Sequence, residues 1–372
     1  MLALFAFAAI TQFLFWGAAG GSAFRTARHE PEQTDNTPAP VSVIVCFRNE
    51  AANIENCLAR ILAQRYAGTF ELLAVDDNST DHSANIVRRL AAEHPDKLRL
   101  LRPGPTRPGK KDALSFGILN ARYEHLLLTD ADCRPRSNDW LRLMTAPLRG
   151  GAEVALGVGE YAVGSGTVDH FQRFEAFYVA VKYLGFARHG LPYMGVGRNL
   201  AYRKSFFLRS GGFAEHTDLP GGDDDLLVSN NALPTGTACV TAGPARTVSS
   251  LSGSWSIFLR QRMRHQSVGF RYRPVHQALL GLLALSHGLF FLLGLFLLFT
   301  VWWKIALLIY ALRLLLVYRA YKGAGFWGAG AGAGKVLRND APPVWALPVF
   351  DALLAPWYVV LGVLGALPAV RW

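Results

Sequence analysis

Charged residues are scarce in this chain: Asp, Glu, Lys and Arg together make up 17% of its 372 residues, whereas an ordinary soluble domain carries about 25%. Acidic side chains are the scarcer kind, and the net charge is +11. Hydrophobic residues make up 51% of the chain, which excludes a disordered protein, because disordered chains lack the apolar residues that form a core. A composition that is both apolar and basic is typical of a membrane protein that keeps Lys and Arg on its cytoplasmic side.

Cysteine is also scarce, and several known binding motifs are missing. Four scattered cysteines without a C-x-x-C pair exclude a disulfide scaffold and a structural zinc site. No G-x-G-x-x-G follows the first expected strand, which argues against a membrane-attached dehydrogenase. The glycine-rich run at 328–336 has Ala329 and Val336 where a phosphate-binding loop needs Gly and Ser or Thr. No basic stripe interleaved with aromatic residues indicates a nucleic-acid partner.

Apolar residues gather at the two ends of the sequence. Residues 1–20 carry no charge and are long enough to span a bilayer. A secretory signal peptide would need a basic start, whereas here Arg25 and Arg28 follow the apolar run. We therefore expect an uncleaved anchor with its N-terminus outside. The polar, proline-containing stretch 25–40 is expected to be a linker.

The second apolar region, 277–370, is expected to form three transmembrane helices at 277–303, 304–321 and 345–370. Arg313 and Asp351 fall inside these helices and should face the bundle interior, because facing lipid would be costly. The loop before the last helix is expected to be cytoplasmic, because it contains the basic residues Arg319, Lys322, Lys335 and Arg338. This topology leaves residues 41–274 as a cytoplasmic domain attached to a bacterial-type plasma membrane, with 255–269 as an amphipathic helix at the membrane interface.

Strand and helix patterns alternate along the domain, which predicts the α/β class. Short apolar runs at 41–47, 70–76, 98–101 and 125–129 are typical of buried parallel strands. Helical spacing of apolar residues follows the first two, and Asn49 is expected to cap the first helix. Residues 112–122 are expected to form a further helix. The pattern predicts an open, mostly parallel sheet, in which ligands bind beyond the carboxyl ends of the strands.

Acidic clusters follow two of these strands. Asp76 and Asp77 end the second strand, and Asp130 and Asp132 end the fourth. One such cluster alone is often only a tight turn, since Asp favours turns. Two clusters at strand ends instead favour a hard divalent cation, Mg²⁺ or Mn²⁺, which binds carboxylates and substrate phosphates.

A basic turn lies between the two acidic clusters. Gly109, Lys110 and Lys111 precede a helix, where backbone N–H groups and the lysines can hold an anion. An exposed basic turn is the alternative. Carboxylates for a metal together with lysines for an anion predict a nucleoside diphosphate ligand.

Seven ordered segments within residues 41–273 resemble the motifs of the membrane-bound, synthase-like members of glycosyltransferase family 2. They are VSVIVCFRNE (41–50), LLAVDDNSTD (72–81), GKKDAL (109–114), LLLTDADC (126–133), GRNLAYRK (197–204), GGDDDLLVS (221–229) and RQRMRHQ (260–266). Each is a modest signal alone, but their order and spacing make the resemblance strong. It implies the GT-A fold, a Rossmann-like domain with a mostly parallel sheet, and transmembrane helices at both ends.

The resemblance also implies roles for residues on the donor side. Glu50, Asp76 and Asp77 would hold the uracil and ribose of a UDP-sugar, with Lys110 nearby. Asp130 and Asp132 would hold Mg²⁺ or Mn²⁺ at the diphosphate, and Asp130 would also contact the nucleotide. The donor implied is a UDP-sugar, and the acceptor is a lipid, a lipid-linked glycan or a polysaccharide at the membrane.

On the acceptor side, Asp223 would be the general base of an inverting transfer. The family motif is commonly Glu-Asp-x-x-Leu, and Gly222 stands in place of its Glu, which leaves Asp224 as an alternative base. A purely structural role at a helix N-terminus is a further alternative for these carboxylates. The remaining acceptor or diphosphate candidates are Arg198, Asn199, Gln261, Arg262 and Arg264.

Two departures from the family pattern leave a second function open. His265 replaces the Trp that stacks on an acceptor sugar in the family, which puts processive polymer synthesis in doubt but not transfer itself. Arg262 and Arg264 could also contact lipid headgroups. The alternative function is a non-catalytic nucleotide- or glycan-binding membrane subunit of a partner synthase.

Overall fold

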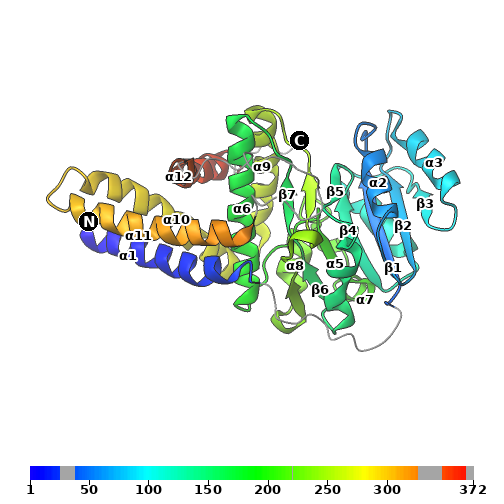
Figure 1. Cartoon of the computed structure of the whole chain (residues 1–372), viewed down its shortest axis with the longest axis horizontal. Coiled ribbons are helices and arrows are strands. Elements are labelled where there is room, and N and C mark those ends of the chain that lie inside the picture. Colours follow the sequence, from blue (N-terminus) through cyan, green and yellow to red (C-terminus); the bar gives the residue numbers. More distant parts are fainter. Residues whose placement is uncertain (26–37, 220, 326–345, 366–372) are drawn as a thin grey trace. The chain divides into compact units, whose positions relative to one another are not determined.

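The computed structural model describes residues 1–25, 38–219, 221–325 and 346–365 (Figure 1). It divides into two compact units, which are described separately below. The first unit comprises Met1–Arg25, Val163–Leu191 and Leu251–Trp372, and the second comprises Thr26–Ala162 and Pro192–Ser250. Residues 163–191 and 251–274, expected to belong to the 41–274 domain, therefore group with the apolar helices at the chain ends.

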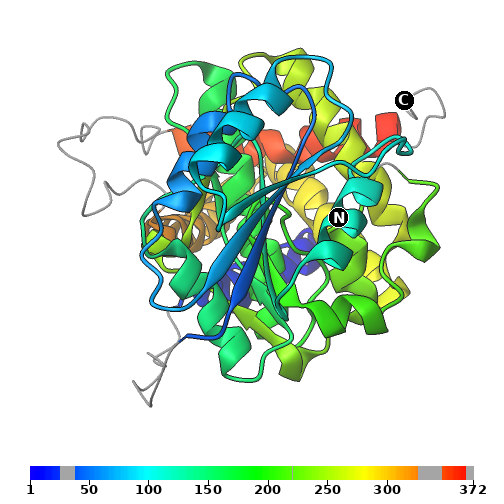
Figure 2. The ribbon, with the colours of Figure 1, turned by 90° about the vertical axis from the view of Figure 1, so that its right-hand side faces the viewer.

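The second unit is built on a seven-stranded sheet with the strand order β3-β2-β1-β4-β8-β6-β9. Blue strands of this sheet run through the centre of Figure 2. Its strands are β1 (Val41–Phe47), β2 (Phe70–Asp76), β3 (Leu98–Leu101), β4 (His125–Asp130), β6 (Val154–Leu156), β8 (Leu200–Arg203) and β9 (Thr237–Cys239). The first four strands pair in parallel, and β8 runs antiparallel to both β4 and β6. The sheet is therefore mostly parallel, as the strand–helix alternation predicts.

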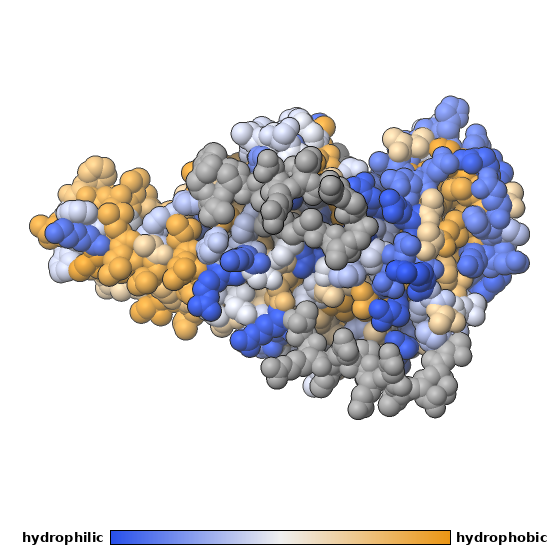
Figure 3. Space-filling view, viewed as in Figure 1, coloured by the Kyte–Doolittle hydropathy of each residue, from blue (hydrophilic) through white to orange (hydrophobic). Residues whose placement is uncertain are grey.

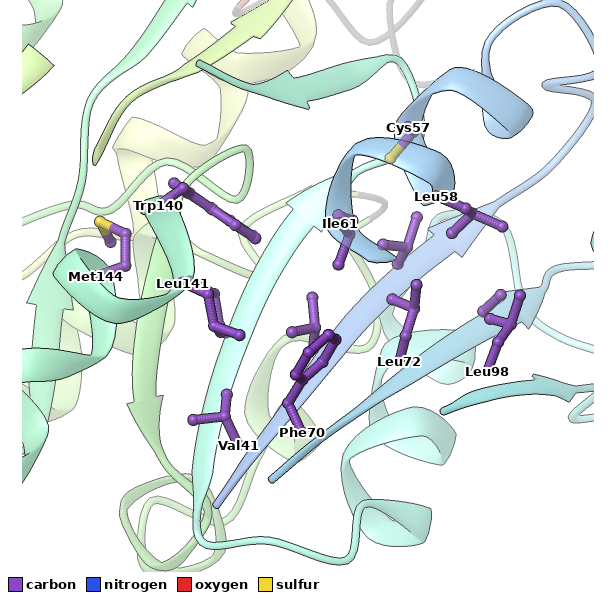
Figure 4. Packing of buried hydrophobic residues seen from close by; sticks show 14 of the residues in the cluster. Val41, Cys57, Leu58, Ile61, Phe70, Leu72, Leu98, Trp140, Leu141 and Met144 are labelled. Atoms are coloured by element: carbon purple, nitrogen blue, oxygen red, sulfur yellow. The ribbon is translucent and has the colours of Figure 1, made fainter. Parts of the chain in front are cut away.

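Helices cover both faces of this sheet. They are α2 (Ile54–Leu62), α3 (Ser83–Glu93), α4 (Lys111–Asn120), α5 (Trp140–Arg149), α7 (Lys204–Arg209) and α8 (Asp225–Asn231). The core between the strands and helices α2, α3 and α5 contains Val41, Phe70 and Trp140 (Figure 4). On the other face, a Cβ at Gly117 of α4 would lie 2.9 Å from Val75 Cγ2. The missing side chain lets α4 pack closely on the sheet and fixes its first residues near the strand ends.

A three-stranded sheet completes the second unit beside the end of β4. It contains β5 (Cys133–Pro135), β7 (Gly159–Tyr161) and β10 (Thr247–Ser249), in the order β5-β10-β7. The central strand β10 pairs with β5 and with β7, and both of these strands precede it by more than 80 positions in the sequence. This sheet carries the segment that follows Asp132.

The first unit is helical throughout its described part. Its elements are α1 (Leu2–Leu14) continued by a π-helix (Phe15–Gly20), α6 (Thr167–Arg188), α9 (Trp255–Val268), α10 (Pro274–Leu297), α11 (Trp303–Ala324) and α12 (Ala346–Gly365). Within the described residues, three helical segments are long and apolar enough to cross a membrane: Leu2–Gly20, Pro274–Leu297 and Ala346–Leu364. Figure 3 shows hydrophobic side chains gathered on the surface of α1, α10 and α11; Leu292, for example, is 67% exposed.

Helix α11 is the predicted second rear span, but it does not meet the same criterion and carries Lys304, Arg313, Arg319 and Lys322. Most of the 25–40 linker and the glycine-rich run at 328–336 lie outside the described residues. The same holds for Lys335 and Arg338 of the expected basic loop.

Polar side chains from four helices meet inside the apolar bundle. Arg313 of α11 forms a bidentate ion pair with Asp351 of α12, and both side chains are fully buried. Gln12 of α1 accepts hydrogen bonds from Arg313 Nε and Nη2 at 3.2 and 2.9 Å. His287 of α10 accepts from Arg313 Nη2 at 3.2 Å, and its Nε2 lies 3.0 Å from the carbonyl oxygen of Asp351. The prediction that Arg313 and Asp351 face the bundle interior is confirmed.

Candidate active site

The carboxyl ends of three neighbouring strands bring the first two acidic clusters together. β1 lies between β2 and β4, with Phe47 opposite Asp76 and Cys46 opposite both Val75 and Asp130. Asp76 and Asp130 therefore end their strands at nearly the same level, on either side of β1. This geometry is the usual position of a ligand site in a parallel sheet.

Asp76 and Asp77 are buried but not isolated. Asp76 is 3% exposed, accepts a hydrogen bond from the Ser79 N–H at 2.9 Å, and pairs with Arg102 at 2.9 Å. Asp77 is 5% exposed and accepts from the Thr106 hydroxyl at 2.6 Å. Both carboxylates are thus held by partners from the loop between β3 and α4.

Two asparagines shape the turns after β1 and β2. Asn49 and Asn78 have positive φ angles of 57° and 61°, which Asn tolerates better than most residues. Asn49 Oδ1 accepts from the Thr80 N–H at 2.8 Å, and this contact fastens one turn to the other. The expectation that Asn49 caps the first helix is wrong, because α2 begins at Ile54 and Asn53 precedes it.

Glu50 lies at the junction of these turns. Its N–H donates to Ser83 Oγ at 2.8 Å, and its carboxylate accepts from Asn53 Nδ2 at 2.8 Å. Burial raises the pKa of Glu50, and the nearby charges of Asp132 and Asp130 raise it further. Glu50 therefore lies within electrostatic range of the metal-binding candidates.

Asp130, Asp132 and Cys133 form a group whose ligand atoms lie within 4.8 Å of one another. Burial and the two neighbouring carboxylates raise the pKa of the Cys133 thiol well above its usual value, so it stays protonated. The thiol donates to Asp132 Oδ1 at 3.2 Å and lies 2.9 Å from Ser249 Oγ. Two of the three members are carboxylates, which are the ligands that a hard cation such as Mg²⁺ or Mn²⁺ prefers.

Lys110 joins the donor side of the site to the acceptor side. Its Nζ lies 2.8 Å from Asp130 Oδ1 and 3.0 Å from Asp223 Oδ2. Burial lowers the pKa of Lys110, but Asp130, Asp223 and Asp224 more than offset this and hold it well above its ordinary value. Lys110 is therefore a permanent positive charge between the two sets of carboxylates.

Asp223 and Asp224 have different surroundings. Asp223 is 8% exposed, and Lys110 is its ion-pair partner. Asp224 precedes α8 and accepts from the Asp225 N–H at 2.9 Å and from the Gly197 N–H at 2.5 Å. Burial, followed by the neighbouring Asp223, raises the pKa of Asp224 to about 6. Both Asp224 oxygens are engaged by backbone, which is the helix-capping role considered among the sequence-based alternatives.

Arg198 and Asn199 are both candidates, from their motif, for contact with the acceptor or the diphosphate. Arg198 lies over the Tyr161 ring at 4.4 Å and donates to Ser249 Oγ at 3.1 Å. Asn199 is fully buried, donates to two backbone carbonyls and accepts from Trp140 Nε1 at 2.9 Å. Its amide is thus fully used inside the protein, so the expectation for Asn199 is corrected to a scaffolding role.

Gln261, Arg262 and Arg264 lie on α9 in the first unit. Arg262 forms a 2.9 Å ion pair with Glu175, and Gln261 accepts from Ser252 Oγ at 3.3 Å. Arg264 is exposed. The pairing with Glu175 gives Arg262 a role within its own unit, and its predicted contact with the diphosphate stays a prediction.

Sequence reasoning missed Arg102 and Thr106, the partners of Asp76 and Asp77. Both lie in a proline- and glycine-rich loop without periodicity. The sequence signal for Arg102 and Thr106 is their position between the third predicted strand and Lys110. This position puts their loop at the same edge of the sheet as the carboxyl ends of the strands.

Comparison with known proteins agrees with this geometry. Residues 42–210 match the model of glycosyl transferase family 2. The chain is 31% identical over 126 residues to a beta-monoglucosyldiacylglycerol synthase from Nostoc sp., covering 33% of this chain and 27% of that protein. It is 28% identical over 191 residues to glycosyltransferase AglE from Haloferax volcanii, covering 49% and 58%. The aligned regions therefore span between about a quarter and three fifths of these relatives.

A solved structure resembles nearly the whole chain. The mannosyltransferase PcManGT from Pyrobaculum calidifontis, in complex with GDP-Man and Mn²⁺, matches with a TM-score of 0.57 and 22% identity, covering 98% of this chain and 97% of the other. At this identity the match shows the fold, which is the GT-A fold with helices at both ends. The family match, together with the ordered motifs and the acidic strand ends, shows that residues 42–210 are a glycosyltransferase family 2 domain.

Proposed function

We propose that this protein is an inverting glycosyltransferase that moves a sugar from a UDP-sugar to a lipid or lipid-linked glycan at the membrane. The observation that carries the proposal is the charge arrangement around Lys110. One lysine contacts both Asp130 of the donor side and Asp223 of the acceptor side. Such an arrangement supports a nucleoside diphosphate bound on one side of Lys110 and a base on the other.

On the donor side, Asp76, Asp77 and Glu50 would hold the nucleoside, because they line the turns after β1 and β2. Asp130 and Asp132 would hold Mg²⁺ or Mn²⁺. When bound, such a cation neutralises the charge that develops on a leaving diphosphate. Lys110 supplies a further positive charge beside the same phosphates. The leaving group therefore needs no proton from the protein.

On the acceptor side, Asp223 is the proposed general base. It takes the proton of the acceptor hydroxyl, and the oxygen then attacks the anomeric carbon from the face opposite the leaving diphosphate. The outcome is inversion with a single protein carboxylate. Asp224 is the less favoured base because backbone N–H groups occupy both of its oxygens, although its raised pKa would suit proton transfer.

Placement at the membrane rests on the helices of the first unit. Three of them could cross a bilayer, and we propose that the catalytic unit lies on the cytoplasmic side. Relatives include a beta-monoglucosyldiacylglycerol synthase and a dolichyl-phosphate beta-glucosyltransferase from Drosophila melanogaster, 33% identical over 125 residues. Both names describe lipid acceptors, which supports a lipid acceptor for this chain.

The test is transfer by the purified full chain with Mn²⁺, lipid extract and a panel of donors that includes UDP-sugars and GDP-mannose. We expect release of UDP, with the sugar recovered on a lipid and its anomeric configuration inverted. The Asp223→Asn variant should lose transfer and keep UDP binding. Release of GDP alone would overturn the donor assignment. Nucleotide binding without transfer from any donor would instead favour the non-catalytic subunit.

A further inference from the structure

Lys111 directly follows Lys110, but its side chain takes a different direction. The residue is 6% exposed, and its Nζ donates to the carbonyl oxygen of Leu219 at 3.0 Å. Leu219 precedes Asp223 by four residues. The second lysine of the basic turn thus contacts the backbone that leads into the proposed base and is withdrawn from solvent.

Keeping an amine at this place is costly. Burial lowers the pKa of Lys111, which means that the surroundings disfavour its charged form. If the side chain at position 111 served only to fill space, an apolar residue would pack there without this cost. The hydrogen bond to Leu219 is one feature that a lysine supplies here and an apolar residue would not.

The chain around Asp223 is held from several sides. Lys110 contacts the Asp223 carboxylate at 3.0 Å, and the Gly197 N–H holds Asp224 at 2.5 Å. A Cβ at Gly197 would lie 2.9 Å from Lys110 Nζ, so the backbone must approach closely at this point. Lys111 adds a contact upstream, at Leu219. Lys110 and Lys111, at the start of α4, therefore contact Asp223 and the Leu219 backbone respectively.

We propose that Lys111 is a positioning residue that holds the Leu219 backbone and thereby aims the Asp223 carboxylate at the acceptor hydroxyl. The inference rests on the proposed function, because it assigns Asp223 as the base. It gives the two lysines different contacts, since Lys110 pairs with the Asp223 carboxylate itself, whereas Lys111 holds the Leu219 backbone and reaches Asp223 through its charge alone.

The test compares Lys111→Met with wild type in the full chain. We expect kcat to fall about 10- to 100-fold, as small misplacements of a catalytic group do, while donor KM and the affinity for UDP with Mn²⁺ stay within about twofold. Lys111→Arg, which keeps a long donor, should recover part of kcat. Hydrogen–deuterium exchange of the peptide spanning 221–231 should increase in Lys111→Met without any substrate present.

Lys204 provides the matched control, because its Nζ donates to the carbonyls of Leu119 and Ala121 at the other end of α4 at 3.1 and 2.8 Å. Lys204→Met should lower the melting temperature but leave kcat and exchange at 221–231 unchanged. The proposal is overturned if Lys111→Met raises donor KM with kcat intact, or if Lys204→Met lowers kcat equally. If wild type transfers no sugar, the proposed function fails, and the exchange difference between the two variants still decides the role of Lys111.

Discussion

The ion pair between Arg313 and Asp351 allows a sharp prediction about the helical unit. Replacing Asp351 with Leu removes both hydrogen bonds of the bidentate pair and leaves the Arg313 guanidinium in a fully buried place. Breaking a buried pair from one side costs about 3–5 kcal/mol, because the other charge stays behind without its partner. We therefore expect Asp351→Leu to lower the free energy of unfolding by that amount.

The magnitude should depend on what remains around Arg313. Gln12 still accepts from Nε and Nη2, and the Phe290 ring lies 5.0 Å from the guanidinium carbon. Because these contacts remain in Asp351→Leu, we expect its loss of unfolding free energy to lie toward the lower end of the range of about 3–5 kcal/mol. Arg313→Leu combined with Asp351→Leu removes both charges, and such double replacements are often neutral or stabilising. The double variant should therefore be more stable than either single variant.

The assay is unfolding of the detergent-purified chain, followed by tryptophan fluorescence, for wild type, both single variants and the double variant. Asp351→Asn serves as a control that keeps the shape and removes the charge. A loss below about 1 kcal/mol in both single variants would refute the reasoning, since surface pairs are worth that little. A double variant whose loss equals the sum of the single losses would refute it too, because the cycle would then show no coupling.

Three further predictions concern the second unit. Asp132→Ala should weaken UDP binding at least about tenfold in Mn²⁺, and calorimetric titration with Mn²⁺ and UDP checks this; unchanged titration would remove Asp132 from the metal site. Asn199→Ala should destabilise the unit by about 3 kcal/mol, because it leaves Trp140 Nε1 and the Ala245 carbonyl without their Asn199 partner and takes one of two donors from the Val158 carbonyl, and thermal unfolding measures the loss. The pKa of Asp224 is raised by burial and by Asp223 from 3.8 to about 6, so its contribution to stability is greatest below pH 3.8 and is lost as the pH rises through 6. Asp224→Asn should flatten that dependence in melts between pH 4 and 7.5, and an unchanged slope would contradict the raised pKa.

The central strands are the part of the fold that the sequence predicts best. β1, β2 and β3 begin and end at the predicted residues. For β1 and β2 the reason is that strands buried on both faces are largely apolar runs bounded by polar turns. The three-residue strands β5, β7 and β10 have no counterpart among the predicted elements. Strands so short carry no periodicity, and their pairing depends on contacts between residues far apart in the sequence.

The same limit explains which site residues could be found. Asp76 and Asp130 follow apolar strands, and the rule for parallel sheets is enough to place them together from the sequence alone. The partner of Asp76 is Arg102, which no rule of spacing selects. Asn199 follows Arg198 in a motif and is therefore a candidate for substrate contact, yet its amide is consumed by Trp140 and two carbonyls. A motif indicates that a residue matters and leaves open whether it contacts substrate or scaffold.

Charge gives the physical reason why the site combines carboxylates with a lysine. The chain carries a net charge of +11, yet four carboxylates surround Lys110: Asp130, Asp132, Asp223 and Asp224. These four carboxylates outnumber the three cations that face them, Lys110, Lys111 and Arg198, and Coulomb energies at partly buried sites amount to several kcal/mol, so the centre without a metal disfavours a diphosphate. A divalent cation on Asp130 and Asp132 reverses that balance, leaving Lys110 for the phosphates and Asp223 for the acceptor. Donor affinity should therefore follow the metal, whereas the rate of transfer should follow the position of Asp223.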